Sequence, residues 1–206
     1  MLIFYTFKMK KTIAAFDFDG TIIKDDSLWG FLKFTVKIHK LILGLFLLSP
    51  ILILYKLKLF SNWKAKQMLF SFFFKGMSLK EFNENCLNFE SIITKSINAD
   101  ALNKILVHKE KEDEVLIVSA SIENWIIPWA ERHNLNIVIA TKIDINHEDC
   151  LTGKFLTANC YGKEKVRRLI ELYPQRNDYV LYAYGDSRGD KELLEFADYS
   201  FYQKFN

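Results

Sequence analysis

The pentapeptide Asp17-Phe18-Asp19-Gly20-Thr21 follows an apolar run, residues 12–16, which reads Thr-Ile-Ala-Ala-Phe. The run predicts a buried strand that ends in two carboxylates, two residues apart. Because side chains alternate along a strand, Asp17 and Asp19 leave it on the same side, and Gly20 lets the chain turn away at once. Paired acids raise each other's pKa unless a cation lies between them, so the segment predicts a divalent-metal site. A polar turn that simply closes the strand is the alternative interpretation.

The composition of the chain limits its class. Its 206 residues allow one full core and a smaller appended unit, and a hydrophobic share of 50% is too high for a disordered chain. The net charge of +3 is too small to indicate nucleic acid, so we predict no nucleic-acid partner. Three widely spaced cysteines without a CxxC motif argue against disulfides and zinc, and predict a cytoplasmic protein. The apolar segment 1–8 is too short for a signal peptide, so we interpret it as a dispensable extension.

Apolar runs and helical patterns alternate in the second half of the chain. Strands are predicted at 115–118, 136–140, 179–184 and 199–202, helices at 122–133, 164–172 and 190–196, and a small hairpin near 151–155. This alternation predicts a parallel sheet with helices on both faces. Residues 27–95 instead look helical throughout. We therefore predict an α/β fold, with a Rossmann-like parallel-sheet core (1–26 and 96–206) and a helical cap domain (27–95) inserted after strand one.

Two local signals subdivide the predicted cap. Pro50 interrupts a long apolar stretch and predicts that one helix is broken there into two arms. Further on, Ser78-Leu79-Lys80-Glu81 has the pattern of a capping box and predicts the start of another helix.

Four short motifs occur in order along this topology. They are Asp17-x-Asp19-Gly20-Thr21, Ser119 after the second strand, a lysine at the start of the helix after Gly162, and Gly185-Asp186-Ser187 after strand 179–184. In this order the chain resembles the haloacid dehalogenase superfamily of phosphotransferases. The helical cap after the first motif is similar to that of the phosphoserine-phosphatase-like branch. Segments 119–125 and 160–166, together with the apolar cap, resemble the phosphatidylglycerophosphatase C group.

The resemblance implies a Mg²⁺-dependent phosphomonoester phosphatase that works through an aspartyl-phosphate intermediate. Asp17 would attack phosphorus, and Asp19 would protonate the leaving alkoxide and then activate water. The Mg²⁺ would be held by Asp17, the backbone carbonyl of Asp19, and Asp186, a ligand set that suits this ion. Asp190 would support the metal from the second layer of contacts, or would simply be an acid that favours a helix N-terminus.

The remaining predicted site residues contact the phosphate ester. Ser119 would donate its hydroxyl, and Ala120 its backbone N–H, to a phosphoryl oxygen. Lys165 would screen the charge of the nucleophile and of the phosphoryl group, and its Gly-x-x-Lys spacing favours it over the neighbouring Lys163. Asp26 would face a polar group of the leaving group, or would be a helix N-cap.

The predicted cap is basic and apolar at once. Residues 27–80 contain nine lysines and eleven aromatic residues but no Asp or Glu, and Lys33, Lys37 and Lys40 are spaced to fall on one helical face. The charge-free run 41–55 is shorter than the roughly 18–20 residues needed to span a bilayer. This favours a helical hairpin that dips into an anionic membrane surface. A soluble cap with solvated lysines and a true membrane span are the alternatives.

The absence of arginine between residues 22 and 110 also bears on the substrate. Phosphoserine phosphatases resemble one another in using a cap arginine to hold the serine carboxylate, and lysine is no equal substitute. We therefore predict a lipid phosphate such as phosphatidylglycerophosphate as substrate, and a location in the cytoplasm at the inner face of the membrane. The alternatives are a phosphatase for a small soluble ester, and a non-catalytic membrane- or partner-binding protein with the same fold.

Overall fold

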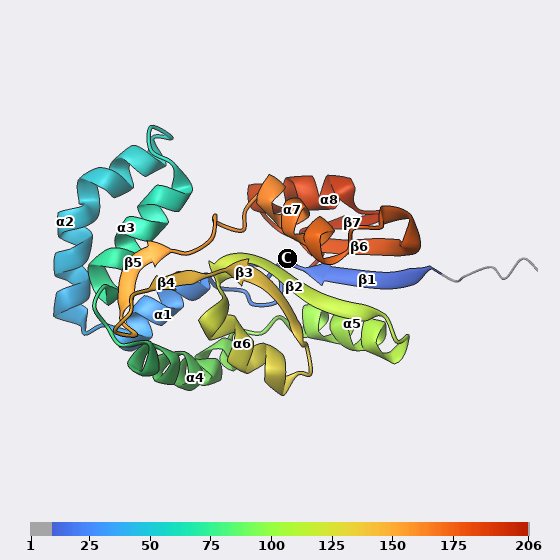
Figure 1. Ribbon diagram of the computed structural model, residues 1–206, viewed down its shortest axis with the longest axis horizontal. Coiled ribbons are helices and arrows are strands. Elements are labelled where there is room, and N and C mark those ends of the chain that lie inside the picture. The colour runs from blue at the N-terminus through green and yellow to red at the C-terminus, as the bar shows by residue number, and fades with distance from the viewer. Residues whose placement is uncertain (1–9, 206) are drawn as a thin grey trace, which may run out of the picture.

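A five-stranded parallel sheet forms the centre of the computed structural model, which describes residues 10–205 (Figure 1). The predicted extension 1–8 lies outside the described residues. In spatial order the strands are β3 (Ile137–Thr141), β2 (Glu114–Ile122), β1 (Lys11–Phe16), β6 (Tyr179–Gly185) and β7 (Tyr199–Tyr202).

Strand β1 lies in the middle of this sheet because it is apolar on both faces. It pairs in parallel with β2 on one side and with β6 on the other, where Ala15 lies opposite Leu116 and Ala183. The backbone N–H of Asp17 continues the ladder by donating to the carbonyl of Tyr184 at 2.9 Å. The carboxyl ends of β1, β2 and β6 therefore meet at one edge of the sheet.

Helices cover both faces of the sheet (Figure 1). The α5 helix (Ala99–Glu110) and the α6 helix (Glu123–Arg132) pack against Ala14 and Phe16 on one face. The α7 helix (Lys163–Leu172) and the α8 helix (Lys191–Phe196) pack against Ile13 and Ala15 on the other. Successive residues of β1 thus enter different clusters, as the alternation of a strand requires. The predicted α/β fold, with a helical insertion after the first strand, is confirmed.

Four helices form the insertion, which we call the cap. They are α1 (Ser27–Thr35), α2 (Ile38–Lys56), α3 (Asn62–Phe74) and α4 (Leu79–Lys95). Phe31 lies at the centre of their packing, with ring centroids 5.3 Å from Phe89 and 4.9 Å from Trp125 of α6. The cap and one face of the sheet therefore share a continuous aromatic core.

A hairpin from the second half of the chain also packs on the cap. It consists of β4 (Ile143–Ile145) and β5 (Leu151–Phe155), which pair antiparallel. Gly76 donates its backbone N–H to the carbonyl of Leu151 at 2.8 Å, and Leu151 donates to the carbonyl of Met77 at 2.9 Å. The cap thus packs against a piece of chain that lies outside the insertion.

The predicted break at Pro50 is wrong, because α2 continues through it. A proline has no N–H to donate to the carbonyl four residues earlier, here that of Phe46. The hydroxyl of Ser49 donates to this carbonyl instead, at 2.7 Å. The side chain next to the proline thus supplies the hydrogen bond that the proline removes, and the hairpin forms between α2 and α3 rather than around Pro50.

The prediction that Lys33, Lys37 and Lys40 share one helical face is also wrong. The chain leaves the helical conformation at Val36 and Lys37, so that Lys33 belongs to α1 and Lys40 to α2. All three lysines are nevertheless exposed.

The start of α4 agrees with its sequence signal. The helix begins at Leu79, and the hydroxyl of Ser78 accepts the backbone N–H of Glu81 at 3.2 Å. This bond satisfies one of the free donors at the helix N-terminus.

Candidate active site

A cavity of about 630 Å³ lies between the carboxyl edge of the sheet and the cap. Its core side holds predicted site residues: Asp17, Asp19, Ser119, Ala120, Lys165 and Asp186. Its cap side includes Trp29, Leu52, Tyr55, Lys66 and Leu69. The structure thus brings residues from both halves of the chain to one place. Their chemical roles remain predictions.

Lys165 is a buried cation that joins two acids of this site. Its Nζ donates to Asp17 at 2.6 Å and to Asp190 at 2.5 Å. The α7 helix begins just before it, after Gly162 in the left-handed region (φ 60°). Lys163, two residues earlier, is exposed. Of the two lysines that the sequence offers, Lys165 is the one at the site.

The positive charge of Lys165 does not fully offset the effect of burial on the pKa of Asp17. Burial raises the pKa of Asp17 to about 8, Lys165 counteracts this rise, and the nearby Asp190 adds to it. Burial alone would lower the pKa of Lys165, but the two aspartates outweigh that effect and raise it. A second cation beside Asp17 would lower its pKa and keep it ionised, and a nucleophile must be in this carboxylate form.

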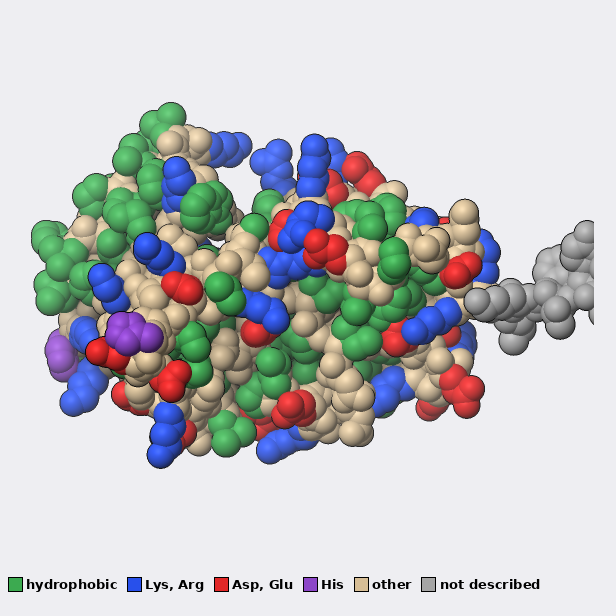
Figure 2. All heavy atoms as spheres, viewed as in Figure 1, with side chains coloured by type: hydrophobic (Ala, Val, Ile, Leu, Met, Phe, Trp, Pro, Cys, Tyr) green, Lys and Arg blue, Asp and Glu red, His purple; other side chains and the backbone are tan. Residues whose placement is uncertain are grey.

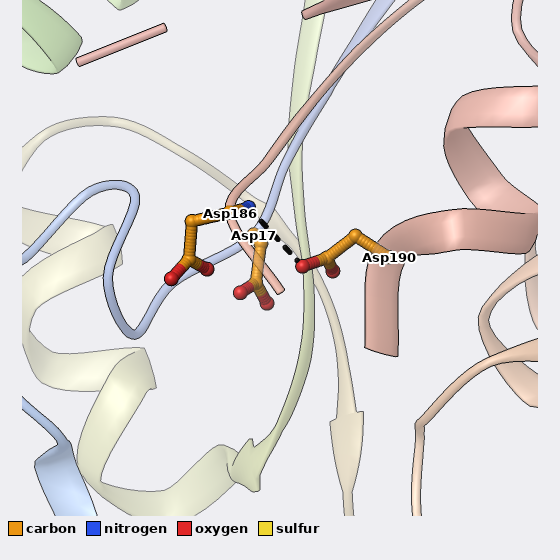
Figure 3. A group of neighbouring side chains, drawn as sticks. All are labelled: Asp17, Asp186 and Asp190. Atoms are coloured by element: carbon orange, nitrogen blue, oxygen red, sulfur yellow. Dashed lines mark hydrogen bonds between the residues drawn. The ribbon is translucent and has the colours of Figure 1, made fainter. Parts of the chain in front are cut away.

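Asp186 and Asp190 lie beside Asp17, with carboxylate oxygens of all three within 4.8 Å of one another (Figure 3). Both oxygens of Asp190 already have partners, since one accepts from Lys165 and the other accepts the backbone N–H of Ser187 at 3.0 Å. It also accepts the N–H of Asp186 at 3.3 Å, which orients that residue. Asp17 and Asp186 therefore remain to hold a hard cation, and their oxygen donors fit Mg²⁺.

Gly20 allows Asp186 to approach this closely. It has a φ of +73°, and a Cβ at this position would lie 2.2 Å from a carboxylate oxygen of Asp186. The glycine after the paired acids is thus required by the close approach of Asp186 as well as by the turn.

Asp19 is held by two serines from different elements. Its carboxylate accepts the backbone N–H of Ser27 at 3.0 Å and a short hydrogen bond from the hydroxyl of Ser121. Burial, followed by the charge of Asp26, raises the pKa of Asp19, whereas Lys66 counteracts the rise. A raised pKa suits a group that must protonate a leaving alkoxide.

Neither serine was identified from the sequence. Ser121 had a signal, because it follows Ser119 by two positions on a strand and so points to the same side. Ser27 had none, because it contacts Asp19 through its backbone N–H, which every residue type except proline offers.

The end of β2 forms the wall next to Asp19. Ser119 is buried, and its hydroxyl accepts the N–H of Ser121 at 3.1 Å. The carbonyl of Ala120 accepts from Thr141 and from Lys66, both at 2.9 Å. These bonds hold the end of β2 from which Ser119 and Ala120 are predicted to contact a phosphoryl oxygen.

Lys66 is a further candidate that the sequence analysis missed. It was counted among the basic residues of the cap surface, but its ammonium crosses from α3 to the carbonyl of Ala120 and faces the cavity. Burial lowers its pKa, and Asp19 and Asp26 oppose that change. Lys66 therefore lies close to Asp19. No pattern in the sequence distinguishes it from the exposed Lys64 on the same helix.

Asp26 has the structural role that was considered as the alternative. It is the N-cap of α1, and its carboxylate accepts the backbone N–H of Trp29 at 3.0 Å. Its exposed side chain also borders the cavity, so a contact with the leaving group stays a prediction.

The chain is similar to known proteins in sequence and in fold. The family described as haloacid dehalogenase-like hydrolase matches residues 14–195. Protein CicA of Caulobacter vibrioides is 30% identical over 194 residues, which cover 94% of this chain and 86% of that protein. A Bordetella pertussis protein of unknown function has a similar structure, with a TM-score of 0.79 at 22% identity over 90% of this chain and 86% of that one. A structure of phosphoserine phosphatase, described as a phospho-aspartyl intermediate analogue, gives a TM-score of 0.58 at 16% identity over 91% of this chain and 84% of that one.

Proposed function

The chain belongs to the haloacid dehalogenase-like hydrolase family, and on that premise we propose that it is a Mg²⁺-dependent phosphomonoester phosphatase. One observation carries the proposal: Asp17 lies at the carboxyl end of β1, bonded to a buried lysine and beside Asp186. The phosphoserine phosphatase of similar fold, whose structure is described as a phospho-aspartyl intermediate analogue, supports the same chemistry here.

The proposed reaction has two halves, which use Asp17 and Asp19 in turn. An oxygen of Asp17 bonds to phosphorus as the ester P–O bond breaks, and Asp19 gives its proton to the leaving alkoxide. Asp19 then takes a proton from water, whose oxygen attacks phosphorus and releases Asp17 and inorganic phosphate. Lys165 and the Ser119 hydroxyl face the charge of the transferring group throughout.

A metal ion fits the acids that lie beside Asp17. Asp17, Asp186 and the backbone carbonyl of Asp19 would hold Mg²⁺, while Asp190 orients Asp186 and Lys165. When bound there, Mg²⁺ supplies positive charge that offsets the repulsion between the carboxylate and a phosphate dianion.

Removing the metal tests this proposal most directly. With p-nitrophenyl phosphate as substrate, exhaustive chelation should lower kcat by about 10³-fold or more, because the metal contributes several kcal/mol of charge stabilisation. Added Mg²⁺ should restore the rate, and Ca²⁺ should inhibit because its larger, looser coordination misplaces the attacking oxygen. Full activity after chelation would contradict the mechanism, and no hydrolysis under any condition would favour the non-catalytic alternative.

For the substrate, we propose an amphiphilic phosphate ester such as phosphatidylglycerophosphate, hydrolysed in the cytoplasm at the inner face of the membrane. The cap side of the cavity supports this, because Leu52, Tyr55 and Leu69 form an apolar wall, whereas Lys66 offers one cation close to the ester. A single ammonium on the cap side can bind a hydroxyl or ester oxygen but cannot bind a carboxylate in the bidentate way that arginine does. The arginine that lines the same cavity, Arg188, follows β6 in the core. The particular likeness to phosphatidylglycerophosphatase C stays a prediction.

A substrate panel with one variant tests this proposal. We expect a higher kcat/KM for phosphatidylglycerophosphate in mixed micelles than for phosphoserine. In Lys66→Met this preference should fall roughly 10- to 100-fold, the worth of one charge-assisted hydrogen bond, while p-nitrophenyl phosphate is affected less. Lys64→Met, an exposed lysine on the same helix, is the matched control and should behave as wild type. Preferred hydrolysis of phosphoserine would refute the lipid proposal and support a small soluble ester.

A further inference from the structure

The α2 helix is apolar on both of its faces, but only one face is packed. Leu41, Gly44 and Leu48 are buried on its inner face, where Gly44 leaves room for the ring of Phe73. On the opposite side lies what we call the α2 outer face: Ile38, Ile42, Leu43, Phe46, Leu47 and Ile53. Phe46 is 74% exposed and Ile42 61% exposed. Figure 2 shows hydrophobic side chains gathered over α2 at the left of the molecule.

The length and exposure of α2 point to a surface that meets lipid. Within residues 10–205, α2 is the one helix long and apolar enough to cross a membrane by length and composition. A core helix of this composition would be mostly buried, yet only 17% of its most apolar 18-residue window is buried. Because α2 lies inside the cap, between α1 and α3, it is not a leader segment either.

The charges that the segment 27–80 places around the α2 outer face have one sign. Lys33, Lys37 and Lys40 lie near the N-terminal end of α2, Lys56 and Lys58 lie at its C-terminal end, and all five are exposed. Residues 27–80 contain no Asp or Glu that could pair with them. An apolar strip with lysines at both ends complements an anionic lipid surface, where the lysine stems lie along the interface.

The same helix borders the catalytic cavity. Leu52 and Tyr55, in its last two turns, line the cavity that contains Asp17. A helix that crossed the bilayer would draw polar residues of the packed α3 helix, such as Asn62 and Lys64, into the hydrocarbon. A helix that lies along the surface avoids this cost and keeps the cavity next to the lipid head groups.

We propose that the α2 outer face docks on an anionic lipid membrane with α2 parallel to the membrane plane, so that a lipid phosphate enters the cavity past Leu52 and Tyr55. The substrate half of this inference rests on the proposed function. The docking half is measured without turnover, and the two can therefore fail separately.

Vesicle flotation with the full chain tests the docking. Wild type should float with vesicles of phosphatidylglycerol and phosphatidylcholine at low salt, less at high salt, and poorly with phosphatidylcholine alone. The double variant Phe46→Glu/Leu47→Glu should lose roughly tenfold or more in vesicle affinity and still hydrolyse p-nitrophenyl phosphate. Leu87→Glu/Leu106→Glu is the matched control, because it places the same charges on exposed leucines of α4 and α5, and it should bind as wild type.

A charge variant tests the electrostatic part. Lys33→Glu/Lys37→Glu/Lys40→Glu should bind anionic vesicles at least about 100-fold more weakly, at about fivefold per lysine, with unchanged hydrolysis of the soluble ester. Wild type that stays unbound at low salt, or full vesicle binding by Phe46→Glu/Leu47→Glu, overturns the docking proposal. So does a wild-type dimer that becomes monomeric in Phe46→Glu/Leu47→Glu without any vesicle binding, because a second copy then covers the face. Vesicle binding without any phosphatase activity would sustain docking and overturn the proposed function.

Discussion

Replacing Asp17 by asparagine should abolish turnover while the protein still folds. The amide keeps the size of the carboxylate and an oxygen that can accept from Lys165, but it cannot form an aspartyl-phosphate. Loss of a covalent nucleophile costs roughly 10⁴-fold or more in kcat. The change also removes a buried carboxyl whose neighbour Asp190 repels it, so thermal unfolding should stay close to wild type. The measurements are the hydrolysis of p-nitrophenyl phosphate and a thermal melt.

The control for this variant is Asp25→Asn. Asp25 is an exposed acid at the rim of the same cavity and is bonded to the hydroxyl of Ser96. It should retain activity within about twofold, as surface substitutions usually do. A trapped covalent phosphate, detected by mass spectrometry in wild type and absent in Asp17→Asn, would identify the nucleophile directly. Unchanged activity in Asp17→Asn would remove Asp17 from that role, and the proposed mechanism with it.

The positions of the catalytic candidates follow from the sequence because they depend on strand ends. Asp17, Ser119 and Asp186 each follow an apolar run, and parallel strands bring their carboxyl ends to one edge of the sheet. Only the parallel arrangement had to be inferred, and the alternation of helices and strands supports it strongly. The position of Lys165 could be predicted for a similar reason, because this residue lies in the first turn of a helix that starts at the same edge of the sheet.

What the sequence did not predict depends on contacts between distant elements. Lys66 reaches Ala120 only because α3 lies over the end of β2, and no local pattern encodes that placement. The β4–β5 hairpin pairs with the chain at Gly76 and Met77, across a sequence separation that periodicity cannot bridge. At Pro50 the general rule about proline failed because a neighbouring serine compensates for the lost hydrogen bond.

The second large effect is expected at Lys165. In Lys165→Met two buried carboxyls, Asp17 and Asp190, lose the cation that bonds them both. Breaking a buried ion pair in this way typically costs about 3–5 kcal/mol, which corresponds to a fall in Tm on the order of 10 °C for a chain of this size. Activity should fall about 10³-fold or more, because the charge of the transferring group is no longer screened. A thermal melt and p-nitrophenyl phosphate hydrolysis measure the two effects, and the exposed Lys163→Met is the control.

The pH dependence of stability separates this explanation from a simple packing defect. A carboxyl whose pKa is raised on folding binds more protons in the folded state than in the unfolded state, so it costs stability as pH rises from the unfolded pKa towards the folded one. For Asp17 in wild type this window runs from about 3.8 to about 8, and removing Lys165 moves its upper limit higher. The Tm deficit of Lys165→Met should therefore be larger at pH 9 than at pH 7, because Asp17 of wild type gives up its proton only above about 8, and the variant has no cation to stabilise the resulting carboxylate. A packing defect would give the same deficit at both pH values. If Lys163→Met loses more activity than Lys165→Met, the lysine of the site has been assigned wrongly.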